Sequence, residues 1–123
     1  MSSVTHQTGV NHAAYAGFLH YLSSGQDPDG LVSADLVGEM TFPHVTFRRE
    51  GKAEFDALRD GVSDQPWDLE PREVIATQDG FVAVVRITSH LRDGDTMTAH
   101  TVSIVTLRDG RLVRLQHWCS GAL

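Results

Sequence analysis

The sequence is poor in cysteine, lacks long apolar runs and carries no excess of positive charge. Its 123 residues include one cysteine, which excludes a disulfide within the chain and favours a reducing, cytoplasmic location. No stretch approaches the roughly 20 apolar residues that a membrane-spanning helix needs. The formal net charge of −6 argues against a nucleic-acid or anionic-membrane partner, because both require a basic surface.

Signals for cofactors, repeats and processing are also absent. The sequence contains no phosphate-binding or nucleotide-binding motif, so no cofactor is expected. The first ten residues, MSSVTHQTGV, have neither the basic segment nor the apolar core of a signal peptide. We therefore predict a flexible tail over residues 1–10 and a single domain over residues 11–123.

Helical signals dominate the first half of the chain. Asn11 is a typical N-cap and Gly25 a typical stop signal, and an apolar stripe at helical spacing lies between them. Residues 27–39 are interpreted as a short second helix or a pair of turns. Residues 40–49 are predicted to form a strand with Pro43 at an edge or bulge, and Gly51 opens a further helix.

The second half alternates between apolar and polar residues, interrupted by Asp-Gly dipeptides at positions 79, 93 and 109. Asp-Gly between alternating runs is a strong hairpin signal, because a type I′ turn needs positive φ at both central residues. Helices followed by a long antiparallel sheet define an α+β fold. The predicted strands cover residues 67–77, 81–91, 96–107 and 111–119.

Two-residue turns also predict which side chains share a face of the sheet. Counting outward places Glu73 opposite Arg86 and Val102 opposite His117. His100, His117 and Cys119 then lie at one end of an apolar face, as in many small-molecule pockets, while Trp118 lies on the other face. The predicted apolar walls are Phe18, Val85, Ile87, Val102, Ile104 and Leu115.

The two histidines are candidates for acid–base chemistry, because imidazole titrates nearest neutral pH. The alternative is that each is a core histidine satisfied by a backbone carbonyl or water. Cys119 is either a nucleophile with His100 as its base or, more commonly for a free cysteine, a small buried hydrophobe. Zinc would need a further ligand that the sequence does not offer, so no metal is expected.

Arg72 is predicted at the same open end of the sheet, where it could hold a carboxylate or an enolate. The alternative is a solvated ion pair with Glu70, which would contribute little. A bulge near Pro71 would turn Arg72 and Glu70 to the opposite face.

Two segments, DGFVAVVRITSH and LRDGRLVRLQHWCS, together with a helix near YAGFLHYLSSGQ, carry a resemblance to a known family. Over residues 11 to 121 the chain resembles the nuclear transport factor 2-like superfamily, and in particular its SnoaL-like polyketide cyclase and ketosteroid isomerase relatives. The resemblance implies a curved sheet wrapped around a long helix, a pocket inside the cone, and often a dimer across the convex sheet. It marks the fold well and the reaction poorly.

Two departures from the family pattern concern the site. Cyclase relatives place an acidic base after the final tryptophan, where this sequence has Cys119 and Ser120. Isomerase relatives use an early-strand aspartate as base, where this sequence offers His44. Tyr15 is similar in position to the isomerase tyrosine that donates to a substrate oxygen, so the resemblance implies the same role for it.

The sequence thus predicts a cofactor-independent acid–base enzyme, an isomerase, cyclase or dehydratase, acting on a hydrophobic carbonyl-containing molecule such as a polyketide or steroid. His117, His100 and Tyr15 are the predicted catalytic residues. The alternative is a non-catalytic module that binds a hydrophobic metabolite or a protein partner. A homodimer is expected across the convex face, through Trp118, Arg86 and Thr101.

Overall fold

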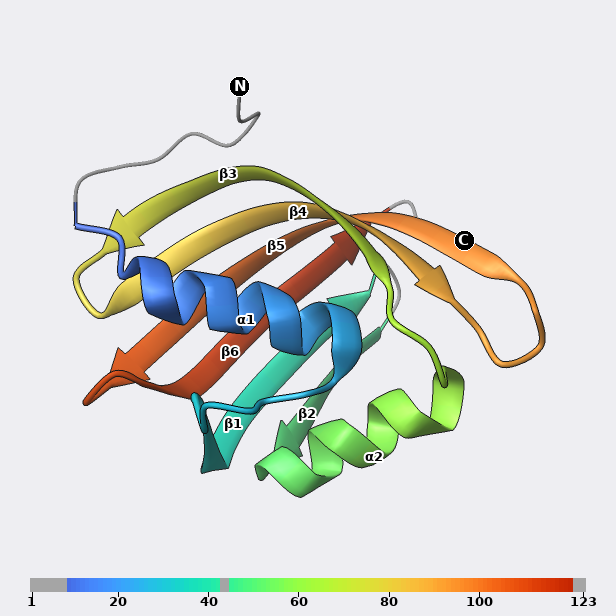
Figure 1. The fold of residues 1–123 in the computed structure, drawn as a ribbon, viewed down its shortest axis with the longest axis horizontal. Coiled ribbons are helices and arrows are strands. Elements are labelled where there is room, and N and C mark those ends of the chain that lie inside the picture. The colour runs from blue at the N-terminus through green and yellow to red at the C-terminus, as the bar shows by residue number, and fades with distance from the viewer. Residues whose placement is uncertain (1–8, 43–44, 121–123) are drawn as a thin grey trace.

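The computed structural model describes residues 9–42 and 45–120, and in these ranges one six-stranded sheet packs against two helices. The predicted α+β fold is confirmed (Figure 1). The elements are α1 His12–Ser24, β1 Val32–Phe42, β2 Val45–Glu50, α2 Lys52–Val62, β3 Asp68–Thr77, β4 Gly80–His90, β5 Thr96–Arg108 and β6 Arg111–Ser120. The strand order is β2-β1-β6-β5-β4-β3, antiparallel throughout except for the β1–β6 pair.

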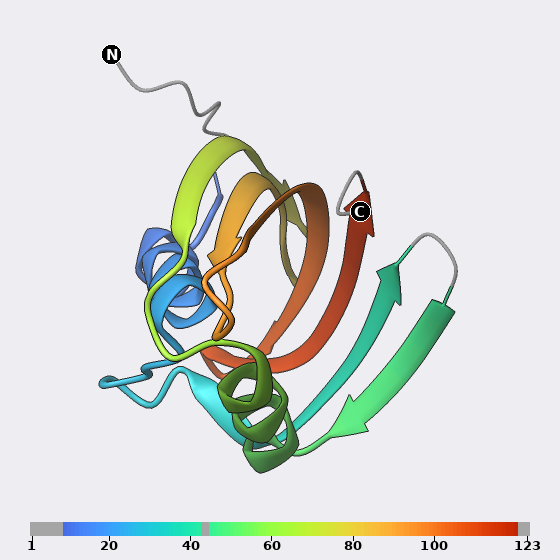
Figure 2. The same cartoon turned by 90° about the vertical axis from the view of Figure 1, so that its right-hand side faces the viewer.

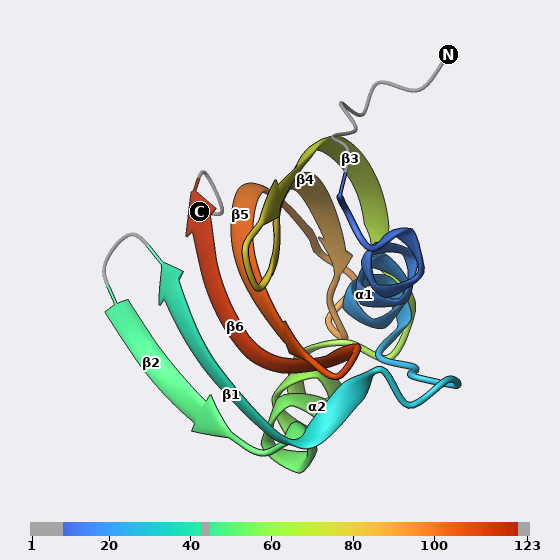
Figure 3. The same ribbon diagram turned by 90° about the vertical axis from the view of Figure 1, so that its left-hand side faces the viewer.

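The sheet curves strongly, and α1 lies along its concave side (Figure 2). Seen from the opposite side, α2 lies beside the start of β1, away from the edge strand β3 (Figure 3). Phe81 anchors α1 to the sheet, because its ring contacts those of Tyr15 and Phe18 edge-on at centroid distances of 5.6 and 5.8 Å. Burial of these rings provides much of the core's hydrophobic stabilisation.

The ends of α1 are as predicted. The Asn11 side chain accepts a hydrogen bond from the Ala14 backbone N–H at 3.0 Å, and Gly25 ends the helix in the left-handed conformation with φ 74°. Gly51 precedes α2, as predicted. Val10, which we assigned to the tail, is buried in the core, whereas residues 1–8 lie outside the described ranges.

The helical interpretation of residues 27–39 was wrong, because most of this segment forms β1. Period-two alternation decides the structure: Leu36, Gly38 and Met40 face inward while the intervening residues face outward. The Asp27 carboxylate accepts the backbone N–H groups of Leu31 and Val32, each at 2.9 Å, and so fixes the entry to the strand. The single strand expected over residues 40–49 is split between β1 and β2, and Pro43 and His44 lie outside the described residues.

Near its turn, over residues 73–77, the first Asp-Gly hairpin preserves the predicted faces but not the predicted partners. Thr77 pairs with Gly80, so the register differs from our count by two residues, and Val74 lies opposite Ala83 rather than Val85. A bulge lies between Pro71 and Glu73. As a result Glu70, not Glu73, lies opposite Arg86.

The second hairpin overturns the predicted faces of β5. Leu91 and Asp95 close a three-residue loop rather than a two-residue turn, with Gly94 at φ 93°. The additional residue shifts the register by one, so that every side chain of β5 changes face. Thr101 and Ser103 face inward and are fully buried. His100, Val102 and Ile104, which we placed on the concave face, face outward instead.

The third hairpin is the predicted two-residue turn, with Asp109 at φ 53° and Gly110 at φ 75°. A bulge between Thr106 and Leu107 then shifts the register by one residue again. The two one-residue shifts cancel on β6. His117 and Cys119 therefore face inward and Trp118 faces outward, as predicted, although the pairings differ from our count.

Candidate functional site

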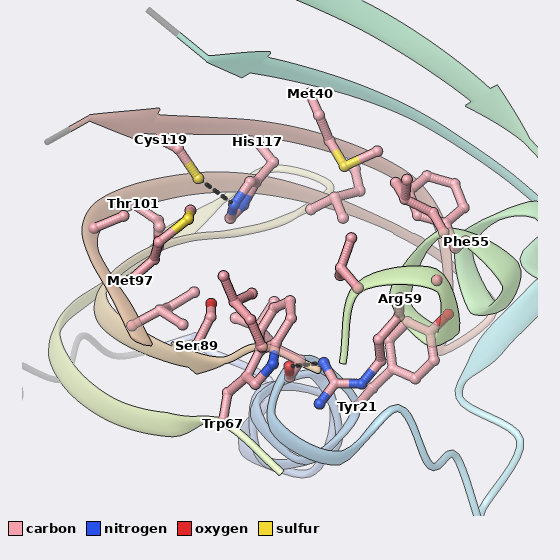
Figure 4. Close-up of a pocket in the computed structure, with 18 of the residues that line it drawn as sticks. Tyr21, Met40, Phe55, Arg59, Trp67, Ser89, Met97, Thr101, His117 and Cys119 are labelled. Carbon is pink, nitrogen blue, oxygen red and sulfur yellow. Dashed lines mark hydrogen bonds between the residues drawn. The ribbon is translucent and has the colours of Figure 1, made fainter. Parts of the chain in front are cut away.

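A cavity of about 650 Å³ lies between the concave face of the sheet and the two helices (Figure 4). Its volume is within the range of pockets that take small organic ligands. The lining is predominantly apolar and includes several aromatic rings. It consists of Phe18, Tyr21, Leu22, Met40, Phe47, Phe55, Leu58, Arg59, Gly61, Val62, Trp67, Ile87, Ser89, Leu91, Arg92, Asp93, Met97, Ala99, Thr101, Leu115, His117 and Cys119.

His117 is the central polar group of this cavity. It lies on β6, only 8% exposed, with Ser103 on β5 directly opposite. The Ser103 hydroxyl lies 2.7 Å from Nδ1 of the imidazole, and the Cys119 sulfur lies 3.2 Å from Nε2. Both ring nitrogens are thus engaged by side chains, and the Cys119 contact is visible at the cavity wall (Figure 4).

Burial keeps this pair uncharged at neutral pH. It lowers the pKa of His117 to about 4, because the imidazolium would lose its hydration. It raises the pKa of the Cys119 thiol to about 11 for the same reason. A thiolate–imidazolium pair, which an activated cysteine nucleophile requires, is therefore disfavoured.

The opposite wall holds polar side chains whose polar atoms are bonded to the protein. The Arg59 guanidinium stacks over the Trp67 ring at 4.1 Å, and donates hydrogen bonds to the backbone carbonyls of Leu22 and Ser23 at the end of α1. The Tyr21 hydroxyl donates to the Asp56 carboxylate at 2.8 Å, and burial followed by this bond raises its pKa. These groups present their apolar parts to the cavity and hold α1 against α2.

The β4–β5 hairpin loop closes one side of the cavity. The Arg92 backbone N–H donates to the Val62 carbonyl at 3.1 Å, and its Nε donates to the Asp60 carbonyl at 2.8 Å. Both acceptors belong to the last turn of α2, where a cation is favourable. Asp93 in this loop is the acidic residue among the described lining residues, and its side chain is exposed.

The predicted site residues separate into two groups. His117, Cys119, Phe18, Ile87 and Leu115 line the cavity, as expected. Six further predicted residues are described by the structure and do not line the cavity: Tyr15, Arg72, Val85, His100, Val102 and Ile104. His44 lies outside the described residues.

Each residue outside the cavity has a structural reason for its position. Tyr15 is buried against Phe81 in the core, and burial raises its pKa. Val85 is fully buried in β4, opposite Thr101 on β5. Arg72 lies at the bulge, where it is exposed and forms an ion pair with Glu70 at 2.8 Å, the solvated alternative considered above. His100, Val102 and Ile104 point away because the three-residue hairpin loop reverses β5.

The predicted pairing of His100 with Cys119 or His117 in one site is therefore wrong. His100 lies on the convex face opposite Arg86, so it cannot serve Cys119 as a base or share a metal with His117. Among the described residues no three histidine, cysteine or acidic side chains are gathered to hold a metal ion. No helix in the described ranges is long and apolar enough to cross a membrane.

Several lining residues were missed from the sequence. Met40 and Phe47 were hidden by the wrong assignment around β1, and Met97 and Thr101 by the reversed register of β5. The same reversal hid Ser103, which is buried behind His117 on the concave face. Phe55 and Leu58 had an available signal, since both lie on one side of a predicted helix and now form one wall. Arg59 and Trp67 carried no distinguishing pattern.

Several solved structures are similar to this fold. It matches an NTF2-like protein from Anabaena variabilis at 14% identity and a TM-score of 0.71, covering 94% of this chain and 92% of that one. A protein from Jannaschia sp. assigned as a SnoaL-like polyketide cyclase matches at 14% identity and 0.67, covering 94% and 90%. An LEH-like epoxide hydrolase from Mycobacterium tuberculosis matches at 15% identity and 0.67, covering 87% and 80%.

The TM-scores show that the chain shares the fold of these structures. Residues 15–115 match the model of the SnoaL-like domain. The chain therefore belongs to the SnoaL-like family, and the resemblance identified from the sequence is confirmed. No curated protein sequence matches it.

Proposed function

We propose that this protein is a cofactor-independent acid–base enzyme that takes a hydrophobic, carbonyl-containing molecule into the cavity. The reaction class is isomerisation, cyclisation or dehydration. The observation that supports this proposal is a neutral imidazole, that of His117, held at the wall of a predominantly apolar cavity. Fold relatives assigned to cyclase and hydrolase activities agree with a pocket enzyme without identifying the reaction.

Each of these reactions needs stabilisation of a developing negative charge on the carbonyl oxygen and transfer of a proton beside it. A neutral imidazole has one nitrogen that donates and one that accepts, so His117 is suited to one of these roles. A low pKa does not prevent the chemistry, because a neutral histidine polarises a substrate carbonyl in triosephosphate isomerase.

The test is exchange of solvent deuterium into a ketone. The protein is incubated in D₂O with a panel of cyclic ketones, and loss of the proton signals beside the carbonyl is followed by NMR. We expect exchange roughly 10²-fold or more above the rate without protein, and a return to background in His117→Phe. Tyr15→Phe is the matched control and should retain exchange, because Tyr15 does not line the cavity. Equal exchange in the parent and His117→Phe would contradict the proposal.

A second candidate function is a non-catalytic binding module for a hydrophobic metabolite. It is favoured by the contact of Nε2 with Cys119, and by the position of the acidic lining residue, Asp93, on an exposed loop. Saturable binding of a ketone without any deuterium exchange would favour this function over catalysis.

We further propose a homodimer through the convex face of the sheet. Trp118 and Arg86 lie on this face, both exposed, whereas Thr101 faces the cavity and was wrongly assigned to the interface. Val102 takes its place, 39% exposed beside Trp118. Exposed tryptophan next to an exposed aliphatic side chain is more typical of an interface than of a solvated surface.

A further inference from the structure

Ser103 is a polar residue that the proposed function does not yet use. Its side chain is completely buried on the concave face of β5, and its hydroxyl is 2.7 Å from Nδ1 of His117. No other hydrogen-bond partner for this hydroxyl is found among the described residues. Thr101, two residues earlier on the same face, instead donates to the Val85 carbonyl at 2.8 Å.

The direction of the Ser103–His117 hydrogen bond follows from this difference. If Nδ1 carried the imidazole proton, Ser103 would accept, and its own buried proton would lack an acceptor in the described part of the chain. Buried hydroxyl donors are rarely left unpaired, because they lose their bonds to water without replacement. If the hydroxyl donates to Nδ1, both groups are satisfied, and the imidazole proton lies on Nε2.

We infer that Ser103 is a positioning residue that fixes the Nε2–H tautomer of His117, so that the cavity presents a hydrogen-bond donor to the carbonyl oxygen of its ligand. In the free protein this N–H faces the Cys119 sulfur at 3.2 Å, which is a weak acceptor. A carbonyl or enolate oxygen is a stronger acceptor and replaces the sulfur at little cost.

The inference deepens the proposed function and rests on it for the identity of the ligand. It assigns His117 the role of stabilising negative charge on the oxygen and leaves Nε2 without a lone pair for the substrate proton. The proton beside the carbonyl is therefore transferred to solvent water acting as the base, and the enolate takes a proton back from solvent. The inference also restricts the ligand class to neutral or enolisable hydrogen-bond acceptors. A molecule whose sole polar group is a protonated amine would face the N–H donor without an acceptor to offer.

The tautomer is measured on the free, full-length protein by long-range ¹H–¹⁵N NMR of histidine-labelled samples at pH 7. The His117 signals are assigned by their loss in His117→Gln. We expect an unprotonated Nδ1 and a protonated Nε2 in the parent protein. Ser103→Ala should raise the population of the other tautomer roughly fivefold or more, since a hydrogen bond of ordinary strength is lost.

Two further variants separate tautomer control from packing. Thr101→Val removes the neighbouring buried hydroxyl, which donates to the Val85 carbonyl, and should leave the tautomer unchanged. Ser103→Thr keeps a hydroxyl and should restore the parent tautomer. If the Ser103 variants do not fold, the parent spectrum alone decides, because a protonated Nδ1 there overturns the inference. The tautomer is measured on the protein without a ligand. A negative deuterium-exchange test would therefore contradict the proposed function and leave the assigned tautomer unaffected.

Discussion

Val102 and Trp118 lie directly opposite each other on β5 and β6, and each side chain is 39% exposed on the convex face. This apolar pair is at the centre of the proposed dimer contact. Trp118→Glu should convert a dimer into a monomer, because a carboxylate cannot be buried there without a partner. Light scattering measures the mass. Gln78→Glu adds the same charge at an exposed turn and should remain dimeric, and an unchanged mass in Trp118→Glu would count against the interface.

Gly38 on β1 is required by the Phe55 ring that packs over it. A Cβ at this position would lie 2.1 Å from the Phe55 Cζ atom, so the ring would be forced towards the cavity. Gly38→Ala should lower the free energy of unfolding by about 1–3 kcal/mol, as overpacking of a core typically does. Urea denaturation monitored by circular dichroism measures the loss.

Gly61 in α2 provides the matched control for Gly38. A Cβ there meets no atom within 4 Å, so Gly61→Ala should be neutral or stabilise the protein by up to about 1 kcal/mol through helix propensity. Equal stability of the two alanine variants would show that the packing of the Phe55 ring does not depend on a glycine at position 38.

Burial of neutral His117 predicts a dependence of stability on pH. Its pKa is about 4 in the folded protein against an ordinary value of 6.5, so the unfolded chain binds more protons between these pH values. The contribution to stability is therefore complete above pH 6.5 and is lost as the pH falls to about 4, by roughly 3 kcal/mol.

Unfolding free energies of the parent and His117→Gln at pH 7, 5.5 and 4 measure this contribution. The difference in stability between the two proteins should change in favour of the variant as the pH falls. A difference that stays constant across this range would show that His117 is not buried in its neutral form.

Cys119 should react slowly in the folded protein. Burial raises the pKa of its thiol from 9.0 to about 11, which lowers the thiolate fraction at pH 8 roughly 100-fold. Since it is the single cysteine, alkylation by iodoacetamide can be followed by the mass of the intact protein. We expect a rate at least 100-fold below that of the urea-unfolded chain. A folded-state rate equal to or above the unfolded one would indicate a thiolate stabilised by His117.

The sequence was sufficient for the fold class, because Asp-Gly turns, alternation and capping residues are local signals. It placed the last four strands to within one residue at each end. It found the turn near Pro28 but failed for residues 32–39, which form a strand in which Gly38 packs against Phe55.

The site was predicted only in part, because faces depend on the exact number of residues in loops and bulges. Asp93-Gly94 belongs to a three-residue loop, which turned His100 away from the cavity and placed Thr101 and Ser103 on the concave face. His117 and Cys119 were placed correctly because a bulge in the next hairpin reversed the error. Sequence patterns specify that turns exist, whereas bulges follow from packing between strands.

Recognition of a carbonyl group by His117 is the central claim, and ligand binding tests it most directly. Trp67 lines the cavity, so its fluorescence reports occupancy once Trp118→Phe removes the other tryptophan. The probes are 1-decalone and decalin, which share a skeleton and differ by the carbonyl. We predict saturable binding with the ketone about tenfold tighter, the equivalent of one ordinary hydrogen bond, and loss of this preference in His117→Phe. Equal affinity for the two probes, or the same preference in His117→Phe, would contradict the account.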